Sequence, residues 1–214
     1  MINLINKDTW IISDHHLNHK NICSFEPCRS VYKELGFNSV EDMLIHNHNK
    51  VVKKDDLVVF LGDFSFNSPE KWIKKFNGRK ILILGNHDRK STQAYKDFDY
   101  VVRGIEIDYN GQLLTHKTDD ELLSAAIINV DNYAVGLCHY PIGDNNIYDK
   151  NRDKIQSRLK TIEPLFDSFS LDIIIHGHLH SNKYTNPPQF PKLIDVSCEK
   201  LNFTPVKLGD LLDL

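Results

Sequence analysis

Five short apolar segments in this sequence each lead into a cluster of aspartate, histidine or asparagine, usually beside a glycine. Short, continuous apolar runs of this kind are typical of strands that are buried on both faces. In α/β sheets, the loops after the carboxyl ends of the strands converge on one crevice. The five clusters can therefore meet in space, and they are Asp14-His15-His16, Gly62-Asp63, Gly85-Asn86-His87-Asp88, His139-Tyr140-Pro141 and His176-Gly177-His178-Leu179-His180.

The segments before these clusters, and several others, are expected to be strands. The strands that carry clusters are predicted over Thr9–Ser13, Leu57–Leu61, Lys80–Leu84, Tyr133–Leu137 and Asp172–Ile175, and a final strand is predicted over Leu193–Cys198. Asn110-Gly111 is a strong hairpin signal between Tyr100–Tyr109 and Gln112–Thr115. Asp131-Asn132 predicts a second hairpin, which joins Ala125–Val130 to Tyr133–Leu137.

Three segments between these strands are expected to be helical. Apolar residues recur at helical spacing from Ser39 to Val52, with Ser39 as a plausible N-cap. A helix over Pro69–Phe76 would begin with a proline at its first position, capped by Ser68. A third is predicted over Asp153–Phe169, and Pro164 should break or kink it. Helices alternating with strands predict an α/β fold.

Length and composition limit the class of protein. The 214 residues suit one domain of ordinary size, so we expect a single domain over residues 1–214. No apolar run approaches the roughly 20 residues that span a bilayer. We therefore expect no membrane partner. The net charge of −3 argues against a broadly basic nucleic-acid-binding surface. The four cysteines lack a metal-finger spacing and are expected to be free thiols, which predicts a cytoplasmic protein.

The residue types in the five clusters suit two divalent metal ions. Asp, His and Asn supply oxygen and nitrogen ligands for Mn, Fe, Ni or Zn, and the sequence does not choose among these metals. Two such ions roughly 3.5–4 Å apart can clamp a phosphate and activate the water between them. The available ligands are Asp14, His16, Asp63, Asn86, His139, His178 and His180. Tight backbone turns beside the metals are expected at three strand-end glycines, Gly62, Gly85 and Gly177.

In this order, the five clusters resemble the sequence blocks of the calcineurin-like metallophosphoesterase superfamily. The segment Asp14–Ile22 has a second histidine, His19, three residues after His16, and is similar to a small single-domain branch of bacterial and phage type. The resemblance implies a four-layer α/β/β/α sandwich of two mixed sheets. It also implies metal-dependent hydrolysis of phosphate esters by a hydroxide that bridges two divalent ions.

The resemblance implies a division of the ligands between the two ions. The first ion would be bound by Asp14, His16 and His180. The second would be bound by Asn86, His139 and His178. Asp63 would be the carboxylate that both ions share.

Further residues would act on the substrate. By the same resemblance, His87 would protonate the departing oxygen, and Asp88 would orient His87 and keep it basic. Contacts to the substrate phosphate would come from His19, Asn86 and Arg89.

Most of these residues also have a structural interpretation. Asp63 could cap a helix, and Asn86 could supply a left-handed turn. His139 could be a hydrogen-bonded histidine at a strand end, and His178 and His180 alternate as if they faced opposite sides of a strand. The presence of all five clusters favours the ligand interpretation.

Three residues are interpreted differently. His15 and His176 are expected to pack in the interior or to support the ligands. Arg29 could contact a phosphate oxygen, but a lone arginine is more often solvated.

The expected substrate is a small, nucleotide-like phosphodiester, because the cluster around His87 suits protonation of a poor alkoxide leaving group. Three alternatives remain. A nuclease for single-stranded or damaged nucleic acid would need basic residues along the cleft, for which the candidates are Lys20, Arg29, Arg89 and Lys183. A phosphomonoesterase is the second alternative. A non-catalytic interaction scaffold is the third, although such a protein should have lost ligands that are all present here.

Overall fold

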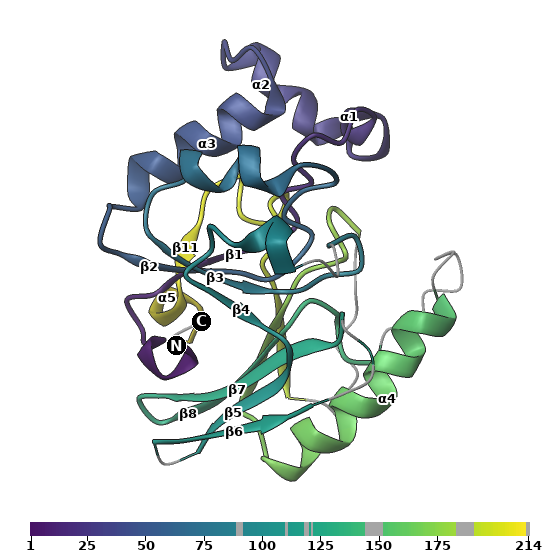
Figure 1. Cartoon of the computed structure of the whole chain (residues 1–214). Helices are drawn as coiled ribbons and strands as arrows, with labels where there is room; N and C mark the ends of the chain where they lie inside the picture. Colours follow the sequence, from purple (N-terminus) through teal and green to yellow (C-terminus); the bar gives the residue numbers. More distant parts are fainter. Residues whose placement is uncertain are drawn as a thin grey trace.

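The computed structural model describes residues 1–88, 92–109, 111–117, 120, 122–143, 152–182 and 191–212. Two mixed β-sheets pack face to face, and helices cover their outer faces (Figure 1). Helix α3 lies over one sheet and helix α4 lies over the other, so the layers run helix, sheet, sheet, helix. The predicted α/β/β/α sandwich of two mixed sheets is confirmed.

The first sheet carries three of the predicted strand ends. Its strand order is β11-β1-β2-β3-β4, and the strands span Val206–Lys207, Trp10–Ile12, Leu57–Phe60, Arg79–Ile83 and Tyr100–Val102. Strands β1 to β4 are parallel, and β11 pairs antiparallel with β1. The carboxyl ends of β1, β2 and β3 therefore lie at one edge of this sheet.

The second sheet carries the other two strand ends. Its order is β10-β9-β8-β7-β5-β6, and the strands span Lys192–Asp195, Ile173–His176, Tyr133–Cys138, Ser124–Val130, Gly104–Tyr109 and Gln112–His116. Strands β8, β9 and β10 are parallel. The pairs β5–β6 and β7–β8 are antiparallel, so both predicted hairpin pairings are confirmed.

The helices are mostly short. The α-helices α1 to α5 span Ile22–Phe25, Val31–Glu34, Val40–Val51, Arg152–Ser168 and Leu208–Leu212. Short 3₁₀ helices occupy Ile2–Leu4, Pro27–Ser30, Pro69–Lys71, Ile73–Lys75 and Thr92–Tyr95. Helix α3 begins as predicted, because the Ser39 hydroxyl accepts a hydrogen bond from the Asp42 N–H at 3.1 Å. Within the described residues, no helix has both the length and the apolar character needed to cross a membrane.

The protein has one hydrophobic core between the two sheets and one between each sheet and its helices. Successive residues of a strand point alternately into the central core and an outer core. In β2, Val59 points into the core between the sheets, and Phe60 packs outward among residues that include Met43 and Leu44 of α3. In β9, Ile174 packs among residues of α4. A strand that is buried on both faces lacks polar alternation, which is why these strands appear in the sequence as continuous apolar runs.

The predicted helix over Pro69–Phe76 is wrong, because the segment forms two 3₁₀ turns. Ser68 has a left-handed φ of 52° and its side chain makes no capping hydrogen bond. Hydrogen bonds span three residues, as in the bond from the Lys71 N–H to the Ser68 carbonyl at 3.0 Å. A segment this short gains little from helix propagation, so the packing of Ile73 and Phe76 beneath it decides its shape.

Three other boundaries differ from the predictions. The expected strand over Tyr100–Tyr109 divides at Arg103, where the chain leaves the first sheet and enters the second. Helix α4 continues through Pro164, because the buried side chains on either side of it hold the helix against the second sheet. The last predicted strand ends at Asp195, and Ser197 instead forms a bridge with Ser13 beyond the end of β1.

Candidate metal centre

The seven predicted ligands come from both sheets and gather where the strand ends meet. The first sheet contributes residues that follow β1, β2 and β3, namely Asp14, His16, Asp63 and Asn86. The second contributes residues that follow β8 and β9, namely His139, His178 and His180. The Ser13–Ser197 bridge joins the ends of the two sheets beside them, with the Cys198 N–H donating to the Ser13 carbonyl at 3.0 Å.

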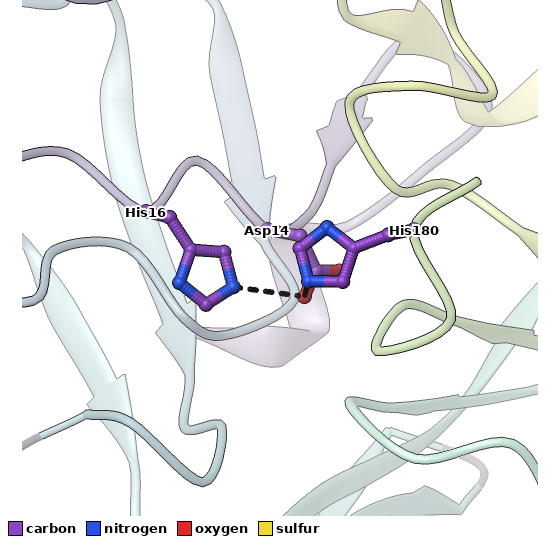
Figure 2. A group of neighbouring side chains, drawn as sticks. All are labelled: Asp14, His16 and His180. Atoms are coloured by element: carbon purple, nitrogen blue, oxygen red, sulfur yellow. Dashed lines mark ion pairs between the residues drawn. The ribbon is translucent and has the colours of Figure 1, made fainter. Parts of the chain in front are cut away.

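One group of side chains that could hold a metal ion consists of Asp14, His16 and His180. Asp14 Oδ1 lies 3.7 Å from His16 Nε2 and 3.6 Å from His180 Nε2. Figure 2 shows the Asp14 carboxylate next to the imidazoles of His16 and His180. One ligand atom from each of the three residues lies within 4.8 Å of the others, which is close enough for one ion to reach all three.

A second group consists of Asp14, Asp63 and His139. Asp63 Oδ2 lies 3.4 Å from His16 Nε2 and 3.6 Å from His139 Nε2. Asn86 Oδ1 is 3.0 Å from the same His139 nitrogen. The Asp63 carboxylate thus lies between a histidine of the first group and a histidine of the second, which is the position that a shared ligand would need.

His178 lies beside this second group. Its ring centroid is 5.1 Å from that of His139, and the rings meet edge to face at 72°. Its backbone N–H donates to Asp14 Oδ2 at 2.8 Å. The structure therefore brings all seven predicted ligands into one neighbourhood.

His139 and His180 each use Nδ1 for a hydrogen bond and direct Nε2 at a carboxylate, that of Asp63 or Asp14. His139 Nδ1 is 2.8 Å from the Leu61 carbonyl, so this nitrogen is the donor. His180 Nδ1 is 3.2 Å from Glu199 Oε1 and is held in the same way. With an ion bound, Nε2 of each ring would present its lone pair on the side of Asp63 or Asp14, because Nδ1 keeps the proton.

Unsatisfied buried atoms provide a test of whether the site suits cations. Asp14 Oδ1 and both ring nitrogens of His16 find no hydrogen-bond partner among the described residues, although all three atoms are buried. A buried carboxylate oxygen without a partner is costly, and such atoms in a native site need an explanation. A divalent cation would satisfy Asp14 Oδ1 together with His16 Nε2, the ring nitrogen that faces it, so the residues present fit a metal ion.

The backbone around the site is strained. Five of the seven predicted ligands have a left-handed φ, between 49° and 74°, and they are Asp14, His16, Asp63, His178 and His180. Non-glycine residues seldom adopt this conformation, which costs of order 1–3 kcal/mol each and concentrates at functional sites.

Gly62 lies where the ends of strands β2, β3 and β8 come close together. Gly62 has a φ of 89°, and a Cβ atom there would lie 2.7 Å from Gly85 Cα and 2.8 Å from His139 Nδ1. Any side chain at Gly62 would therefore separate β2 from the ends of β3 and β8. The expected tight turn at this position is confirmed.

The charges of the site stabilise one another. Burial alone would raise the pKa of Asp14, but the neighbouring His180, His139 and His16 hold the pKa well below its usual range. Burial alone would lower the pKa of His180, whereas the carboxylates of Asp14 and Glu199 raise that pKa to about 9. The carboxylates are therefore anionic at neutral pH and available to cations.

Asp88 has partners other than the expected one. Within the described part of the chain, Asp88 Oδ2 accepts hydrogen bonds from the N–H groups of Asp63 and Gly85, both at 2.8 Å, and not from the His87 ring. Its other oxygen accepts from the Tyr95 hydroxyl at 3.0 Å. Burial and the nearby Asp63 charge raise the pKa of Asp88 to about 6. The Asp88 carboxylate therefore holds the backbone at Asp63 and Gly85 in place, because it accepts hydrogen bonds from both N–H groups.

Two of the residues expected to meet the substrate have rings next to that of His16. His87 has an exposed side chain, its ring lies 5.4 Å from that of His16, and its N–H donates to Asp63 Oδ1 at 2.8 Å. His19 lies on the same side, with its ring centroid 6.0 Å from that of His16. Arg89, also expected here, lies outside the described residues.

Two supporting residues escape prediction from the sequence. Arg29 is fully buried, where a solvated residue was the expectation, and it donates to the carbonyls of His15 at 2.7 Å and Asp14 at 2.5 Å. Its Nε also donates to Glu199 at 2.6 Å, and the same carboxylate oxygen holds His180. Arg29 and Glu199 are 170 positions apart, so no local signal connects them.

His15 shows that proximity in the sequence does not make a ligand. Its ring is buried and contacts three phenylalanines, with centroid distances of 5.1 Å to Phe60, 5.7 Å to Phe64 and 5.5 Å to Phe76. Burial lowers its pKa well below the usual value, which keeps the ring neutral. The expected packing role is confirmed.

Comparison with known proteins gives a consistent picture. The sequence model of the calcineurin-like phosphoesterases matches residues 8–182, a range that contains all five clusters. Protein MJ1445 of Methanocaldococcus jannaschii is 32% identical over 218 residues, covering 96% of this chain and 89% of the relative. Gene 66 protein of Mycobacterium phage L5 is 30% identical over 188 residues, covering 81% of this chain and 78% of the relative.

A solved structure has the same fold. The crystal structure of AQ665 from Aquifex aeolicus aligns with a TM-score of 0.70 and a sequence identity of 24%. The alignment covers 96% of this chain and 97% of AQ665.

Proposed function

Because this chain belongs to the calcineurin-like phosphoesterase family, we propose that it hydrolyses phosphodiesters of small, nucleotide-like molecules with two divalent metal ions. Family membership and the Asp/His groups support metal-dependent hydrolysis of phosphate esters. The observation that carries the finer proposal is the position of Asp63, whose Oδ2 faces His16 at 3.4 Å and His139 at 3.6 Å.

We keep the division of the ligands that the family resemblance implies, and the group of Asp14, His16 and His180 supports its first half. Asp14, His16 and His180 would hold the first ion, and Asn86, His139 and His178 the second, with Asp63 shared. When bound, the ions would supply Lewis acidity and a nucleophilic water at neutral pH. The left-handed backbone at five ligands sets the direction of their side chains before an ion binds. The hydrogen bonds of His139 Nδ1 and His180 Nδ1 fix the orientation of these two rings.

His87 is the residue that would transfer a proton. Its exposed ring lies beside His16, and its backbone N–H donates a hydrogen bond to Asp63 Oδ1. In this position it would donate a proton to the departing oxygen of the substrate. A diester releases a poor alkoxide leaving group, which gains more from such a proton than an activated leaving group does.

One of the basic residues on which the nuclease alternative depends is not available to bind nucleic acid. Of the four basic residues that would line a nucleic-acid cleft, Arg29 is fully buried and paired with Glu199. Arg89 and Lys183 lie outside the described residues. The net charge of −3 also favours a small substrate over long duplex DNA.

Hydrolysis of two model substrates tests the proposal. Metal-stripped protein would be resupplied with Mn²⁺, Ni²⁺ or Zn²⁺ and assayed on bis-p-nitrophenyl phosphate and on p-nitrophenyl phosphate. Metal-dependent cleavage of the diester is the expected result. Cleavage of the monoester alone would replace the proposal with a phosphomonoesterase, and metal binding without cleavage of either would favour the interaction scaffold.

A further inference from the structure

A chain of aromatic rings leads from the proposed metal ligands to the surface. The His87 ring lies 5.4 Å from His16 and 5.7 Å from Phe66, measured between ring centroids. The His19 ring lies 4.6 Å from Phe66 and 5.7 Å from Phe25. Phe25 and Phe66 are 69% and 41% exposed, so two phenyl rings reach solvent directly beside the residues that would face a phosphate.

The loops that carry these rings are fixed to each other. Leu17 and Ser65 form an isolated β-bridge, and the Phe66 N–H donates to the Leu17 carbonyl at 2.9 Å. The Ser65 hydroxyl donates to the same carbonyl at 3.1 Å. The Ile22 N–H donates to the His19 carbonyl at 3.0 Å, which ties His19 to the helix that ends at Phe25. The backbone segments that carry Phe66 and Phe25 are therefore anchored to the segment of Leu17 and His19.

We propose that Phe25 and Phe66, both packed against His19, form a stacking platform for the nucleobase of a substrate whose phosphate lies at the proposed metal site. The proposal rests on the phosphodiesterase function proposed above. Every nucleobase has a flat π-face, so exposed aromatic rings bind bases without requiring a particular sequence. The two phenyl rings stand at 73° and 81° to the His19 ring, and this edge-to-face packing fixes their orientation.

The extent of the apolar surface favours a small ligand. Among the described residues, Phe25 and Phe66 are the exposed large apolar side chains in ring contact with His19, and the exposed residues between His16 and Phe25 include the polar Asn18 and Lys20. A protein partner would need a wider apolar surface than this. A nucleotide needs one flat contact close to a phosphate site, and Phe66 is in ring contact with His87, the residue proposed to meet the leaving oxygen.

The test compares two phosphates that differ only in the base. Binding of adenosine 5′-monophosphate and of ribose 5-phosphate to Mn²⁺-loaded protein would be measured by calorimetry and by inhibition of bis-p-nitrophenyl phosphate hydrolysis. If Phe25 and Phe66 form the platform, adenosine 5′-monophosphate should bind at least about tenfold more tightly than ribose 5-phosphate. Phe66→Leu and Phe25→Leu should each reduce this preference, and Phe66→Tyr should keep it. Leu113→Ala is the control, because Leu113 is 46% exposed on strand β6.

The outcomes separate the two proposals. If bis-p-nitrophenyl phosphate is hydrolysed but the two ligands bind equally well, the platform is excluded and the proposed function stands. If nothing is hydrolysed but the base still strengthens binding in a way that depends on Phe66, the platform stands and the proposed function falls. A base preference that survives both leucine substitutions would overturn the assignment to these rings.

Discussion

Glu199 links two residues that are distant in the sequence and essential to the geometry of the site. One of its carboxylate oxygens accepts from Arg29 Nε at 2.6 Å and lies 3.2 Å from His180 Nδ1. Through Arg29 it also secures the Asp14 carbonyl. Glu199 is therefore a positioning residue for the first proposed metal ion, since it fixes the ring direction of one ligand and the backbone of another.

Glu199→Gln should weaken metal binding while leaving the ligands themselves unchanged. The amide loses the charge that holds the His180 Nδ1–H, so we expect Mn²⁺ affinity to fall by about 10- to 100-fold. Calorimetric titration of metal-stripped protein measures this affinity. Glu34→Gln, at an exposed position in α2, should leave it unchanged. Equal affinities in the two variants would show that Glu199 only supports the fold.

His87→Ala should separate proton donation from metal binding. The variant should retain its metal, because the expected ligands of both ions lie elsewhere. Its kcat/KM for a diester with a nucleoside leaving group should fall by about 100-fold or more. The loss for bis-p-nitrophenyl phosphate should be much smaller, since p-nitrophenolate departs without a proton. Equal losses on both substrates would contradict the role of His87 as the proton donor.

At the scale of the elements, the strands are predictable from sequence because burial on both faces leaves continuous apolar runs. The turns at their ends are predictable for a different reason, since glycines beside Asp, His and Asn mark close backbone approach. The two 3₁₀ turns at Pro69–Lys71 and Ile73–Lys75 were not predictable, because packing beneath them outweighs local helix propensity. The change of sheet at Arg103 also lacks a local signal, since both flanking segments favour strand.

Gly62→Ala should destabilise the protein more than Gly111→Ala. Both glycines have a left-handed φ, 89° and 78°, so alanine is strained at either position. A Cβ at Gly62 would meet Gly85 Cα at 2.7 Å, whereas nothing lies within 4 Å of one at Gly111. We expect the crowding to add about 1–3 kcal/mol to the loss in unfolding free energy, measured by urea denaturation. Equal losses would mean that the strand ends can separate without cost.

At the scale of the whole molecule, the family, the layered fold and the meeting of the strand-end clusters all follow from the sequence. The five clusters form the candidate site because each lies at the carboxyl end of a strand, and the sheets then bring them together. The support around them does not follow from the sequence. Arg29 and Glu199 pair across 170 positions, and the Asp88 carboxylate turns toward the Asp63 backbone instead of the adjacent His87 ring.

Stability should fall as the pH drops from about 6.5 to 4, partly because of His48. Burial lowers the pKa of this histidine from 6.5 to about 4, and its Nε2 lies 3.0 Å from the Asn77 carbonyl. In this pH range the unfolded chain binds a proton that the folded chain does not, so acidification favours unfolding. The loss attributable to His48 is about 3 kcal/mol in total.

Urea denaturation between pH 4 and 7 checks this expectation against His48→Gln, which keeps a donor for the Asn77 carbonyl but does not titrate. The variant should show a shallower decline in unfolding free energy over this range. Parallel curves for the two proteins would show that His48 is not the group responsible.

If two metal ions share Asp63, the metal content of the wild-type protein and of an Asp63 variant should differ. Metal-stripped wild-type protein and Asp63→Asn would be equilibrated with Mn²⁺ and analysed for bound metal per chain. Asparagine retains an oxygen that can accept the His87 N–H but lacks the negative charge that both ions would need. We predict two ions per wild-type chain and loss of this binding in Asp63→Asn. Two ions still bound to Asp63→Asn, or none bound to the wild type, would show that Asp63 is not a ligand shared by two ions.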